Sequence, residues 1–592
     1  MDIATDLPQE LEACHALIRE RLARLAQQDD RLARHEETIE ALRKQIEQLE
    51  AEQEKLRKLA AHLANGHRSE RHVPANPDQR WLPFDSAAEF QEARAEAEAE
   101  AEAIVQKYEV TRTIRPKKKR DESFPSHLKR LEKIDNGDEA HQVCPTHGPR
   151  RLLGYDVTET LMWKPAELHV LVTKYAKYVC DGEAACGVAS PERPTTLVEG
   201  GRYDTSVAAA VIDAKWHLHL PIYRQQDVFA GSGWIPSRST LNNLVLRAAF
   251  VVVEFMQYMK ARVQNDVCIG LDDTSCRMLM PRDEVVVVAG DQKSQRLAEK
   301  VAEAKAKREQ SLIGKMWAYQ GLSEAPYNIF DFRVSRHRDG PEEFSKNSRC
   351  VVMADCYSGN TSVVLRSDER LKLAACWAHA RRKIKEAFTY TKERDTLLEM
   401  INALYDVETR AANMSSDERL ALRAKESQLI LSAMGAWLDT TPIAQVLSKS
   451  DFAEAVRYIR NHWEALNVYL GDGRVPIDNN SVERLMKQVA MGRKAWLFVS
   501  NVESGEQSAM LMSLVSSAKR HDLDVWTYVK DVLDQLLAGS TNYESLLPDV
   551  WKRAHPEAVR EYRVEERQQK AERKELNTAK RRLALKAARE KR

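Results

Sequence analysis

The sequence lacks three features that would assign it to a class at once. No uncharged apolar run among its 592 residues reaches the ~18 residues that a membrane-spanning helix needs, so we expect a soluble protein without a membrane partner. Its first twenty residues contain no basic stretch followed by an apolar one, which argues against a secretory signal and predicts a cytoplasmic location. Net charge is also missing, since 90 Lys and Arg oppose 89 Asp and Glu, and any affinity for nucleic acid must come from local patches.

Cysteine is scarce, with nine residues scattered over a chain long enough for several domains. An odd, scattered set favours reduced thiols over a disulfide framework. Four potential zinc ligands nevertheless form two pairs, Cys144 with His147 and Cys180 with Cys186. The two-residue gap of the first pair lets both side chains face one tetrahedral ion, so residues 136–195 are predicted to form a zinc-ribbon-like domain with structural Zn²⁺. Ordinary thiols beside a loop histidine are the alternative.

Heptad spacing marks the N-terminal region. One apolar column and, from Ile39 onward, a second column repeat every seven residues between 10 and 64: Leu11, Ile18, Leu25, Leu32, Ile39, Ile46, and Leu42, Leu49, Leu56, Leu63. The residues between the columns are mostly Glu, Lys, Gln and Arg, so the apolar seam is narrow and needs a partner helix. We expect a coiled coil over 10–64 and self-association through it. A lone amphipathic helix folded back on its own chain is the alternative.

Composition divides the next part of the chain. Residues 87–107 are rich in Ala and Glu without an apolar stripe, which predicts a solvated helical spacer within a helical and basic linker over 65–135. Residues 112–130 carry eight Lys or Arg against two acids, a run that is compatible with DNA phosphates and equally with a solvated linker. The cations proposed to contact DNA there are Lys117, Lys118, Lys119 and Arg120. Residues 196–264 are helical in pattern, with a turn and a Ser or Thr N-cap after Gly233, which fits a DNA-binding region or plain helical packing.

Two strand-like runs in the second half end in acids. Residues 267–271 lead into Asp272, and residues 350–354 lead into Asp355 in the same way. Further strands are predicted over 284–289, 316–321 and 327–334, and a helix over 477–487 adds Glu483. Two carboxylates at strand ends and one on a helix are what two-metal phosphoryl transfer requires, because hard oxygen ligands hold two Mg²⁺ across the attacking and leaving oxygens.

Four motifs follow from the first of these acids onward: Asp272-Asp-Thr, Cys376-Trp-Ala-His-Ala-Arg-Arg-Lys383, Asp472-Gly-Arg-Val-Pro-Ile-Asp-Asn-Asn-Ser-Val-Glu-Arg484 and Gly492-Arg-Lys-Ala-Trp-Leu-Phe498. They resemble the motifs of the insertion sequence 66 family of bacterial DDE transposases. Three upstream segments are similar to the same family in the same order: Phe124-Pro-Ser-His-Leu-Lys-Arg130, His219-Leu-Pro-Ile-Tyr-Arg-Gln225 and Ser237-Arg-Ser-Thr-Leu241. The resemblance covers roughly residues 10–535.

The resemblance implies an RNase H-like α/β catalytic core over 265–540, within a multidomain α+β/α protein. It carries the catalytic triad over as Asp272, Asp355 and Glu483, ligands for Mg²⁺ or Mn²⁺ with two ions per active site. The 128 residues between the last two acids predict a helical insertion at about 385–472. The chain departs from the family at Asp273, where the family has Glu, and at Cys356, where it has Gly. Neither change removes a ligand.

The resemblance also implies an activity. The protein is expected to bind the terminal inverted repeats of its own element and to catalyse DNA cleavage and strand transfer. Its partners would be double-stranded DNA at transposon ends and targets, a second copy of itself and accessory proteins of the same element, in the nucleoid of a bacterium. The alternatives are a catalytically idle DNA-binding and oligomerisation protein, and a metal-dependent nuclease without strand transfer.

Other residues in and after the motifs carry weaker expectations. Six cations are predicted DNA contacts, with a solvated helix face as the alternative: Arg381, Arg382, Arg484, Lys487, Arg493 and Lys494. Cys376 and His379 are expected to serve packing and hydrogen bonding rather than a metal, and Trp496 to lie in the core rather than to stack on a base. The tail over 541–592 is predicted to be a basic helix, either contacting DNA nonspecifically or frayed.

Overall fold

The computed structural model describes residues 84–114, 203–440 and 450–590 without a break. Elsewhere it describes Leu82, Val446, parts of 15–45, and short pieces at 143–144, 148–149, 168–170, 178–179, 188–189 and 194–198. The described pieces between 15 and 45 are helical and exposed, but most of the predicted coiled coil lies outside the described residues. The basic run Lys117, Lys118, Lys119 and Arg120 lies outside them as well.

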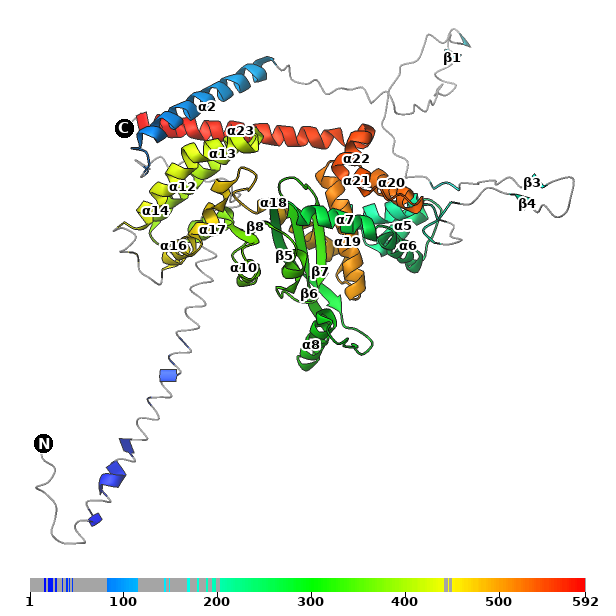
Figure 1. Cartoon of the computed structure of the whole chain (residues 1–592), viewed down its shortest axis with the longest axis horizontal. Helices are drawn as coiled ribbons and strands as arrows, with labels where there is room; N and C mark the ends of the chain where they lie inside the picture. The colour runs from blue at the N-terminus through cyan, green and yellow to red at the C-terminus, as the bar shows by residue number, and fades with distance from the viewer. Residues whose placement is uncertain are drawn as a thin grey trace, which may run out of the picture.

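A mixed five-stranded sheet lies at the centre of the protein (Figure 1). Its strand order is β7 (Asn328–Arg333), β6 (Ser311–Gly321), β5 (Cys268–Leu279), β8 (Cys350–Ala354) and β9 (Leu371–Ala375). β5, β6 and β7 are antiparallel neighbours, whereas β8 and β9 run parallel to β5. β5 pairs with β8 so that Cys268 lies opposite Val351 and Gly270 opposite Met353. This register brings the segments that carry the predicted catalytic aspartates side by side.

The outer edge of the sheet is covered by a helix. Edge strands expose unpaired backbone groups, and here α19 (Val502–Arg520) supplies serine hydroxyls to β7. The Phe330 N–H donates to Ser513 Oγ at 2.7 Å, and the Asn328 N–H donates to Ser517 Oγ at 3.0 Å. Short elements surround the sheet: α9 (Asp339–Phe344), α10 (Ser358–Leu365), α20 (Val525–Leu537), α21 (Tyr543–Leu546), α22 (Pro548–Ala554) and a 3₁₀ turn (Pro556–Ala558).

The region before the sheet is helical, as predicted. It contains α4 (Thr205–Ile212), a π-helical turn (Asp213–His217), α5 (Ile222–Gly231), α6 (Arg238–Val251) and α7 (Val253–Gln264). Ser237 is the N-cap of α6, where its hydroxyl accepts from the Thr240 N–H at 3.0 Å. No single helix in the described residues is long and apolar enough to cross a membrane. α6 and α7 meet that length and composition only when taken together across a 56° bend.

Three strand predictions need correction. Residues 284–289 form no strand, and the side chains of Val286, Val287 and Val288 are exposed. A β-branched run becomes a strand only when another strand takes up its backbone hydrogen bonds, and no described strand pairs with these residues. β5 does not stop at Asp272 but continues to Leu279, and β9 was not predicted. The charged segment after β5 contains α8 (Gln292–Ala306), which projects from the far end of the sheet (Figure 1).

Helices fill the segment between β9 and the last predicted catalytic acid. They are α11 (Trp377–Glu386), α12 (Thr391–Arg410), α13 (Ser416–Leu422), α14 (Gln428–Leu438), α16 (Asp451–Asn461) and α17 (Trp463–Asn467), with shorter turns at Ala411–Asn413, Arg423–Ser427 and Val468–Gly471. The fully buried Arg423 ties this bundle together, since it forms an ion pair with Glu408 at 2.8 Å and donates to the carbonyls of Tyr469 and Asp472. The bundle is thereby anchored to the loop that precedes Glu483.

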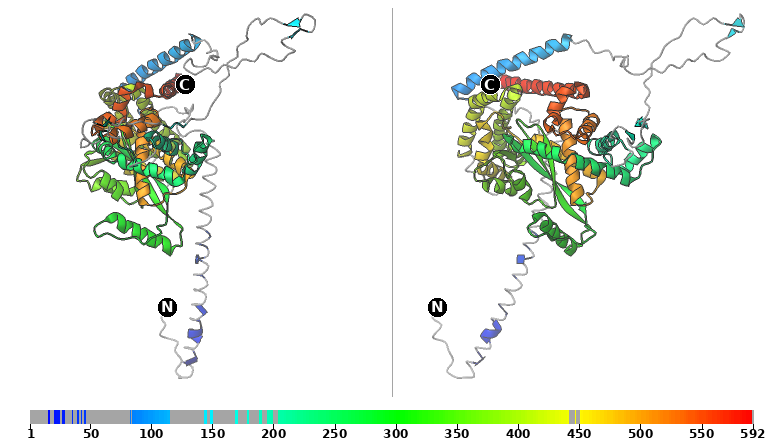
Figure 2. Two further views of the ribbon diagram at one scale, coloured as in Figure 1. Left: turned by 90° about the vertical axis from the view of Figure 1, so that its right-hand side faces the viewer. Right: turned by 45° about the vertical axis from the view of Figure 1, so that its right-hand side comes forward.

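The Ala- and Glu-rich segment is a helix but not a solvated spacer. α2 (Ala88–Ile114) packs along the C-terminal helix α23 (Glu561–Glu590), and both cover the helical bundle (Figures 1 and 2). Phe90, Ala93, Ala97 and Ala101 are buried in this contact. Alanines spaced four residues apart let two helices approach closely, and this is why the absence of large apolar residues was misleading. The basic tail is helical to Glu590, and its C-terminal part packs against α2 and α12, whereas most side chains of 561–575 are exposed.

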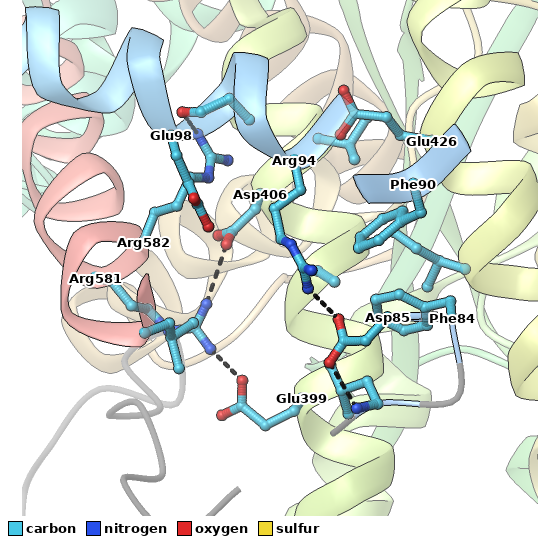
Figure 3. Close-up of a pocket in the computed structure, with 16 residues that line it drawn as sticks. Phe84, Asp85, Phe90, Arg94, Glu98, Glu399, Asp406, Glu426, Arg581 and Arg582 are labelled. Atoms are coloured by element: carbon cyan, nitrogen blue, oxygen red, sulfur yellow. Dashed lines mark hydrogen bonds and ion pairs between the residues drawn. The ribbon is translucent and has the colours of Figure 1, made fainter. Parts of the chain in front are cut away.

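Ion pairs line the junction of α2, α23 and α12, which we call the clasp. Arg581 contacts Glu399 at 2.6 Å and Asp406 at 3.1 Å, around a cavity of about 100 Å³ (Figure 3). Arg94 contacts Asp85 at 2.6 Å at the other side of this cavity. Arg582 donates to the Ala97 carbonyl at 3.2 Å. The clasp thus joins the two ends of the described chain through paired charges.

Two short hairpin-like pairs lie in the predicted zinc-ribbon region. β1 (Val143–Cys144) pairs with β2 (Gly148–Pro149), and β3 (Tyr178–Val179) pairs with β4 (Val188–Ala189). In sequence, His147 falls between β1 and β2, while Cys180 and Cys186 fall between β3 and β4. The Cys144 side chain and these three residues lie outside the described residues, so the zinc site stays a prediction.

Candidate active site

The two neighbouring acids of β5 have different surroundings. Successive side chains of a strand point to opposite faces, so Asp272 and Asp273 cannot share one site. Asp273 is 3% exposed and forms ion pairs with Lys315 at 2.9 Å and with Arg336 at 2.6 Å. Asp272 forms no ion pair within the described residues, and one of its oxygens accepts from the Asp273 N–H at 2.8 Å. Asp273 is therefore a neutralised structural acid, and Asp272 is the acid left with unsatisfied charge.

Asp355 directly follows β8, beside the strand that carries Asp272. Its Oδ1 accepts from the Asn360 side chain at 2.7 Å, which fixes the carboxylate from the first turn of α10. Its Oδ2 lies 3.8 Å from Arg336 Nη2, and the Arg336 guanidinium stacks 3.9 Å above the Tyr357 ring. Arg336 thus connects the neutralised acid of β5 with the acid after β8.

Glu483 lies in the first turn of α18 (Asn480–Trp496). Its two oxygens face α11, where His379 Nε2 lies 3.5 Å from Oε1 and Arg382 Nη2 lies 3.7 Å from Oε2. Oε1 is buried and accepts no hydrogen bond.

The pKa of Asp272 shows that the three acids share one electrostatic environment. Burial is the largest cause that raises this pKa, to about 7. The negative charges of Asp355, Asp273 and Glu483 raise it further. The hydrogen bond from the Asp273 N–H acts in the opposite direction. A buried carboxyl whose ionisation is opposed by three neighbouring acids is a site that a cation would stabilise.

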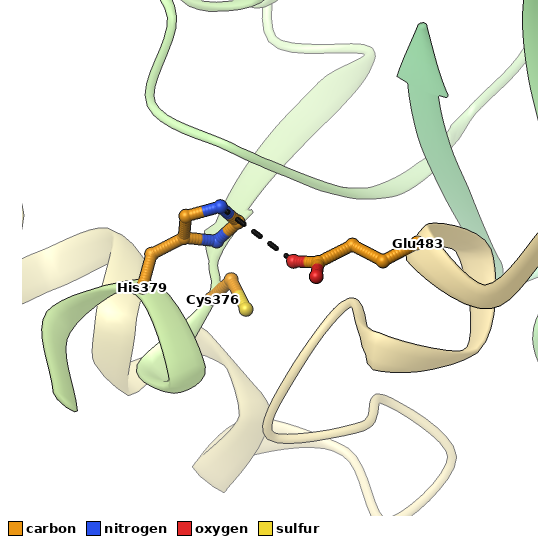
Figure 4. A group of neighbouring side chains, drawn as sticks. All are labelled: Cys376, His379 and Glu483. Carbon is orange, nitrogen blue, oxygen red and sulfur yellow. Dashed lines mark ion pairs between the residues drawn. The ribbon is translucent and has the colours of Figure 1, made fainter. Parts of the chain in front are cut away.

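Cys376 and His379 lie next to Glu483 (Figure 4). Among the described residues, these three form the one set whose potential metal-ligand atoms all lie within 4.8 Å of one another. The third member had no signal in the sequence, because Glu483 follows Cys376 by more than a hundred residues. Burial raises the pKa of the Cys376 thiol to about 12, and its sulfur accepts from the Asn479 N–H at 3.2 Å. A neutral, hydrogen-bonded thiol favours the predicted packing role over metal binding.

Asn479 locks the helix of Glu483 onto the strand of Asp272. Its buried side chain donates to the Leu271 carbonyl at 3.0 Å, one residue before Asp272. A Cβ at Gly270 would lie 2.5 Å from Val482 Cγ2, so this close contact requires glycine on the strand. The Trp377 N–H donates to the Ile477 carbonyl and ties the same loop to α11. The contact between Asn479 and the strand was not predicted, although Asn479 lies in one of the motifs of the family resemblance.

The predicted DNA contacts divide into two groups. Arg484, Lys487 and Lys494 are exposed on α18. Arg493 instead donates to the Ser275 carbonyl at 2.7 Å and holds α18 against β5. On α11, Arg382 lies near Glu483, and Arg381 lies 5.5 Å from the Tyr405 ring. Trp496 is partly buried against the core, as predicted.

Comparison with known proteins gives this arrangement a family. A family model described as "Transposase IS66 family" matches residues 200–507, just over half of the chain. The chain belongs to the IS66 family of transposases. The resemblance inferred from the motifs is thereby confirmed. The matched residues of this IS66-family protein include all three acids, the helical bundle and α18, but neither α2 nor α23 of the clasp.

Three proteins of Sinorhizobium fredii are similar over most of their length. Uncharacterized protein y4jD is 29% identical over 447 residues, which are 72% of this chain and 81% of y4jD. Uncharacterized protein y4hP is 27% identical and uncharacterized protein y4qI 26% identical, covering 70% and 76% of this chain and 75% and 79% of their own. Membership in a transposase family points to a DNA-processing enzyme and implies DNA binding.

Proposed function

We propose that this IS66-family protein is a DDE transposase that binds the terminal inverted repeats of its element and cuts and joins DNA at Asp272, Asp355 and Glu483. The observation that carries the proposal is the charge of this site. Asp355, from the neighbouring parallel strand, and Glu483, from a distant helix, both raise the pKa of Asp272, which has no cationic partner among the described residues. The mixed sheet with its acids on adjacent parallel strands supports an RNase H-like core.

The residues present fit divalent metal ions. Glu483 Oε1 is buried and has no hydrogen-bond partner among the described residues, and burial together with the neighbouring acids raises the pKa of Asp272. Carboxylate oxygens are the ligands that Mg²⁺ and Mn²⁺ prefer. When bound, two such ions would supply a more acidic attacking water and stabilise charge on the leaving 3′ oxygen.

The chain's own residues hold and orient the DNA. Asn360 fixes Asp355, and Asn479 fixes the start of the Glu483 helix, so the acids keep their positions while the nucleic acid changes. Arg382 beside Glu483 and the exposed Lys487 on the same helix would contact phosphates flanking the cut. The freed 3′-OH would then attack target DNA at the same acids, without a covalent enzyme intermediate.

The predicted coiled coil and zinc site would help to assemble two copies of the protein on DNA. The coiled coil over 10–64 would pair two copies so that two active sites meet two transposon ends. A structural zinc at Cys144, His147, Cys180 and Cys186 would hold the two small hairpins between that coil and the helical region. Metal analysis of the purified protein tests this point, because zinc-free protein with native folding would contradict it.

The deciding experiment is strand transfer by the full-length protein on labelled DNA carrying the element's end, in Mg²⁺ or EDTA. Asp272→Asn, Asp355→Asn and Glu483→Gln should each lower joined product by at least about a hundredfold, since metal ions contribute several kcal/mol to such reactions. End binding should persist in all three variants. The matched control is Asp368→Asn, because Asp368 is exposed and its positive φ of 48° suits asparagine.

The products separate the proposal from its two alternatives. Cut ends that are never joined to target DNA would indicate a nuclease without strand transfer. End binding without cutting, even with the element's accessory proteins added, would indicate a catalytically idle DNA-binding protein. Mn²⁺ titration by calorimetry supplies a readout independent of activity, and each acid variant should bind Mn²⁺ more weakly than the control.

A further inference from the structure

The motif that follows the Glu483 helix contains residues with clear structural roles. A Cβ at Gly492 would lie 2.3 Å from Trp496 Cζ2, so glycine lets the indole lie across the helix. Arg493 holds α18 to β5 through the Ser275 carbonyl. Val499 is buried, and its N–H donates to the Arg277 carbonyl at 2.8 Å. Folding therefore explains these four positions of residues 492–499.

Leu497 and Phe498 have no such role. Leu497 has φ 63° and ψ −52°, and the Phe498 N–H donates to the Trp496 carbonyl at 2.7 Å, which together define a strained γ-turn. Both side chains point away from the core, with 58% of Leu497 and 41% of Phe498 exposed. A backbone conformation that L-residues rarely adopt is thus maintained while two large apolar side chains stay in solvent. Such strain is concentrated at sites that bind ligands.

The two residues end an exposed stripe that begins beside the catalytic glutamate. Side chains three or four residues apart share one helix face, and this spacing relates four exposed residues of α18 to Phe498: Arg484, Lys487, Met491 and Lys494. Leu497 follows Glu483 by fourteen residues, which corresponds to ~21 Å along a helix. That length equals about six base pairs of DNA at ~3.4 Å each.

We propose that Leu497 and Phe498 form a contact for DNA bases, inserted at an opened base step about six base pairs from the phosphate held at the acids. The inference rests on the proposed function and adds a second DNA site to it. Apolar wedges and aromatic side chains stabilise unstacked or unpaired bases, and the basic stripe would hold the adjoining backbone. Symmetric pairing of this surface with a second copy is disfavoured, because it would bring Lys487 and Lys494 against the same cations of the partner.

The test measures base opening without catalysis. Full-length protein, without added Mg²⁺ or Mn²⁺, is titrated into 40-base-pair duplexes that carry 2-aminopurine at single positions from three to nine pairs from the cleaved end, and into forked versions of them. Wild type should increase the fluorescence most near the sixth position and should bind forked DNA about tenfold more tightly than paired DNA, as expected for stacking on one base. Phe498→Ala should lose both effects, and Phe498→Trp should keep them.

Two further variants keep the result interpretable. Leu497→Gly removes the side chain while its positive φ suits glycine, so this variant should fold at least as well as wild type yet show weaker opening. Lys494→Gln should reduce the salt dependence of binding by about one unit of slope without changing the forked-to-paired ratio. Leu365→Ala, at another apolar side chain that is 79% exposed, is the matched control and should change nothing.

The contrary outcomes are distinct. Equal binding of forked and paired DNA by wild type, or an unchanged ratio in Phe498→Ala, would overturn the base contact while leaving the transposase proposal intact if strand transfer persists. Loss of self-association in Phe498→Ala with unchanged DNA opening would assign the surface to a protein contact instead. Failure of wild type to bind any of the duplexes, together with absent strand transfer, would reject the proposed function itself.

Discussion

The active site and the clasp use the same residue types to opposite effect. Both place carboxylates in buried surroundings between elements that are distant in sequence. At the clasp, Glu399 and Asp406 meet Arg581. At the active site, Asp272 has acids as its charged neighbours, and its pKa is raised to about 7.

The difference teaches what each arrangement is for. Buried charges that are fully paired define how helices fit together, and removing one partner leaves the other uncompensated. Buried acids that repel one another lower stability in the free protein, and a protein retains them where a ligand supplies the missing charge. β5 contains one acid of each kind. Asp273 is paired with Lys315 and Arg336, whereas its neighbour Asp272 has no cationic partner among the described residues.

The largest effect is expected from breaking the clasp. Arg581→Ala leaves two acids at the cavity without their cation and should reduce the free energy of unfolding by about 3–5 kcal/mol. Urea denaturation of the full-length protein measures this loss. An unfolding curve that coincides with wild type would show that α23 does not need the ion pairs. Strand-transfer activity of folded Arg581→Ala should stay close to wild type, because the catalytic acids lie elsewhere.

The second prediction is a change in the free energy of unfolding of the opposite sign, at the active site. Asp272→Asn removes the opposed charge and should stabilise the metal-free protein by about 1–3 kcal/mol at pH 8. The folded-state pKa of Asp272 lies above its ordinary value of 3.8, so stability falls as pH rises from about 4 and levels off above about 7. The gain in Asp272→Asn should therefore shrink toward pH 5. Thermal unfolding at both pH values checks it.

Metal binding sharpens the comparison further. Protonated Asp272 cannot coordinate a cation, so Mn²⁺ affinity should fall about tenfold per pH unit below its pKa of about 7 and change little above it. Calorimetric titrations at pH 6 and pH 8 measure the difference. Asp368→Asn should retain this dependence. A flat profile in wild type would mean that Asp272 is not a ligand.

The smallest effects belong to ion pairs at the solvent-exposed margin of the clasp. Lys586 contacts Glu102 at 2.7 Å and Lys425 contacts Glu96 at 2.7 Å, with all four side chains largely accessible to water. Solvent screens such pairs, so Lys586→Ala and Lys425→Ala should give unfolding midpoints indistinguishable from wild type. A clear loss in either variant would show that the whole charged surface acts as one network, and the distinction between buried and exposed pairs would fail.

Part of this architecture could be predicted from local sequence. The apolar runs that lead into Asp272 and Asp355 were recognisable because buried parallel strands are continuous apolar runs, although β5 continues past Asp272 to Leu279. The helices after β9 were recognisable by their period. The same reasoning wrongly predicted a strand at the valine run 286–288, because strand formation depends on a partner strand that the local sequence does not reveal. The prediction that α2 is a solvated spacer was wrong for a different reason, because its buried face consists of Ala93, Ala97 and Ala101 and not of large apolar residues.

The three acids of the candidate site could be predicted from the sequence, but their electrostatic surroundings could not. Asp272, Asp355 and Glu483 were chosen by pattern and by family resemblance, and their mutual influence emerges only when β5, β8 and α18 are assembled. The neutralisation of Asp273 by Arg336 and the lock formed by Asn479 depend on residues tens to hundreds of positions apart. Long-range contacts of this kind leave no periodic signal in the sequence.

The clasp can form only late in the synthesis of the chain. Its hydrogen bond from Arg582 to Ala97 spans 485 residues, so α2 leaves the ribosome long before its partner exists. At ~5–20 residues per second, synthesis of the intervening chain lasts about 25–100 s. During that interval the alanine face of α2 is uncovered, and the nascent N-terminal region can meet another chain before it meets its own C-terminus. Completion of α23 is therefore the event that ends this period and closes the molecule on itself.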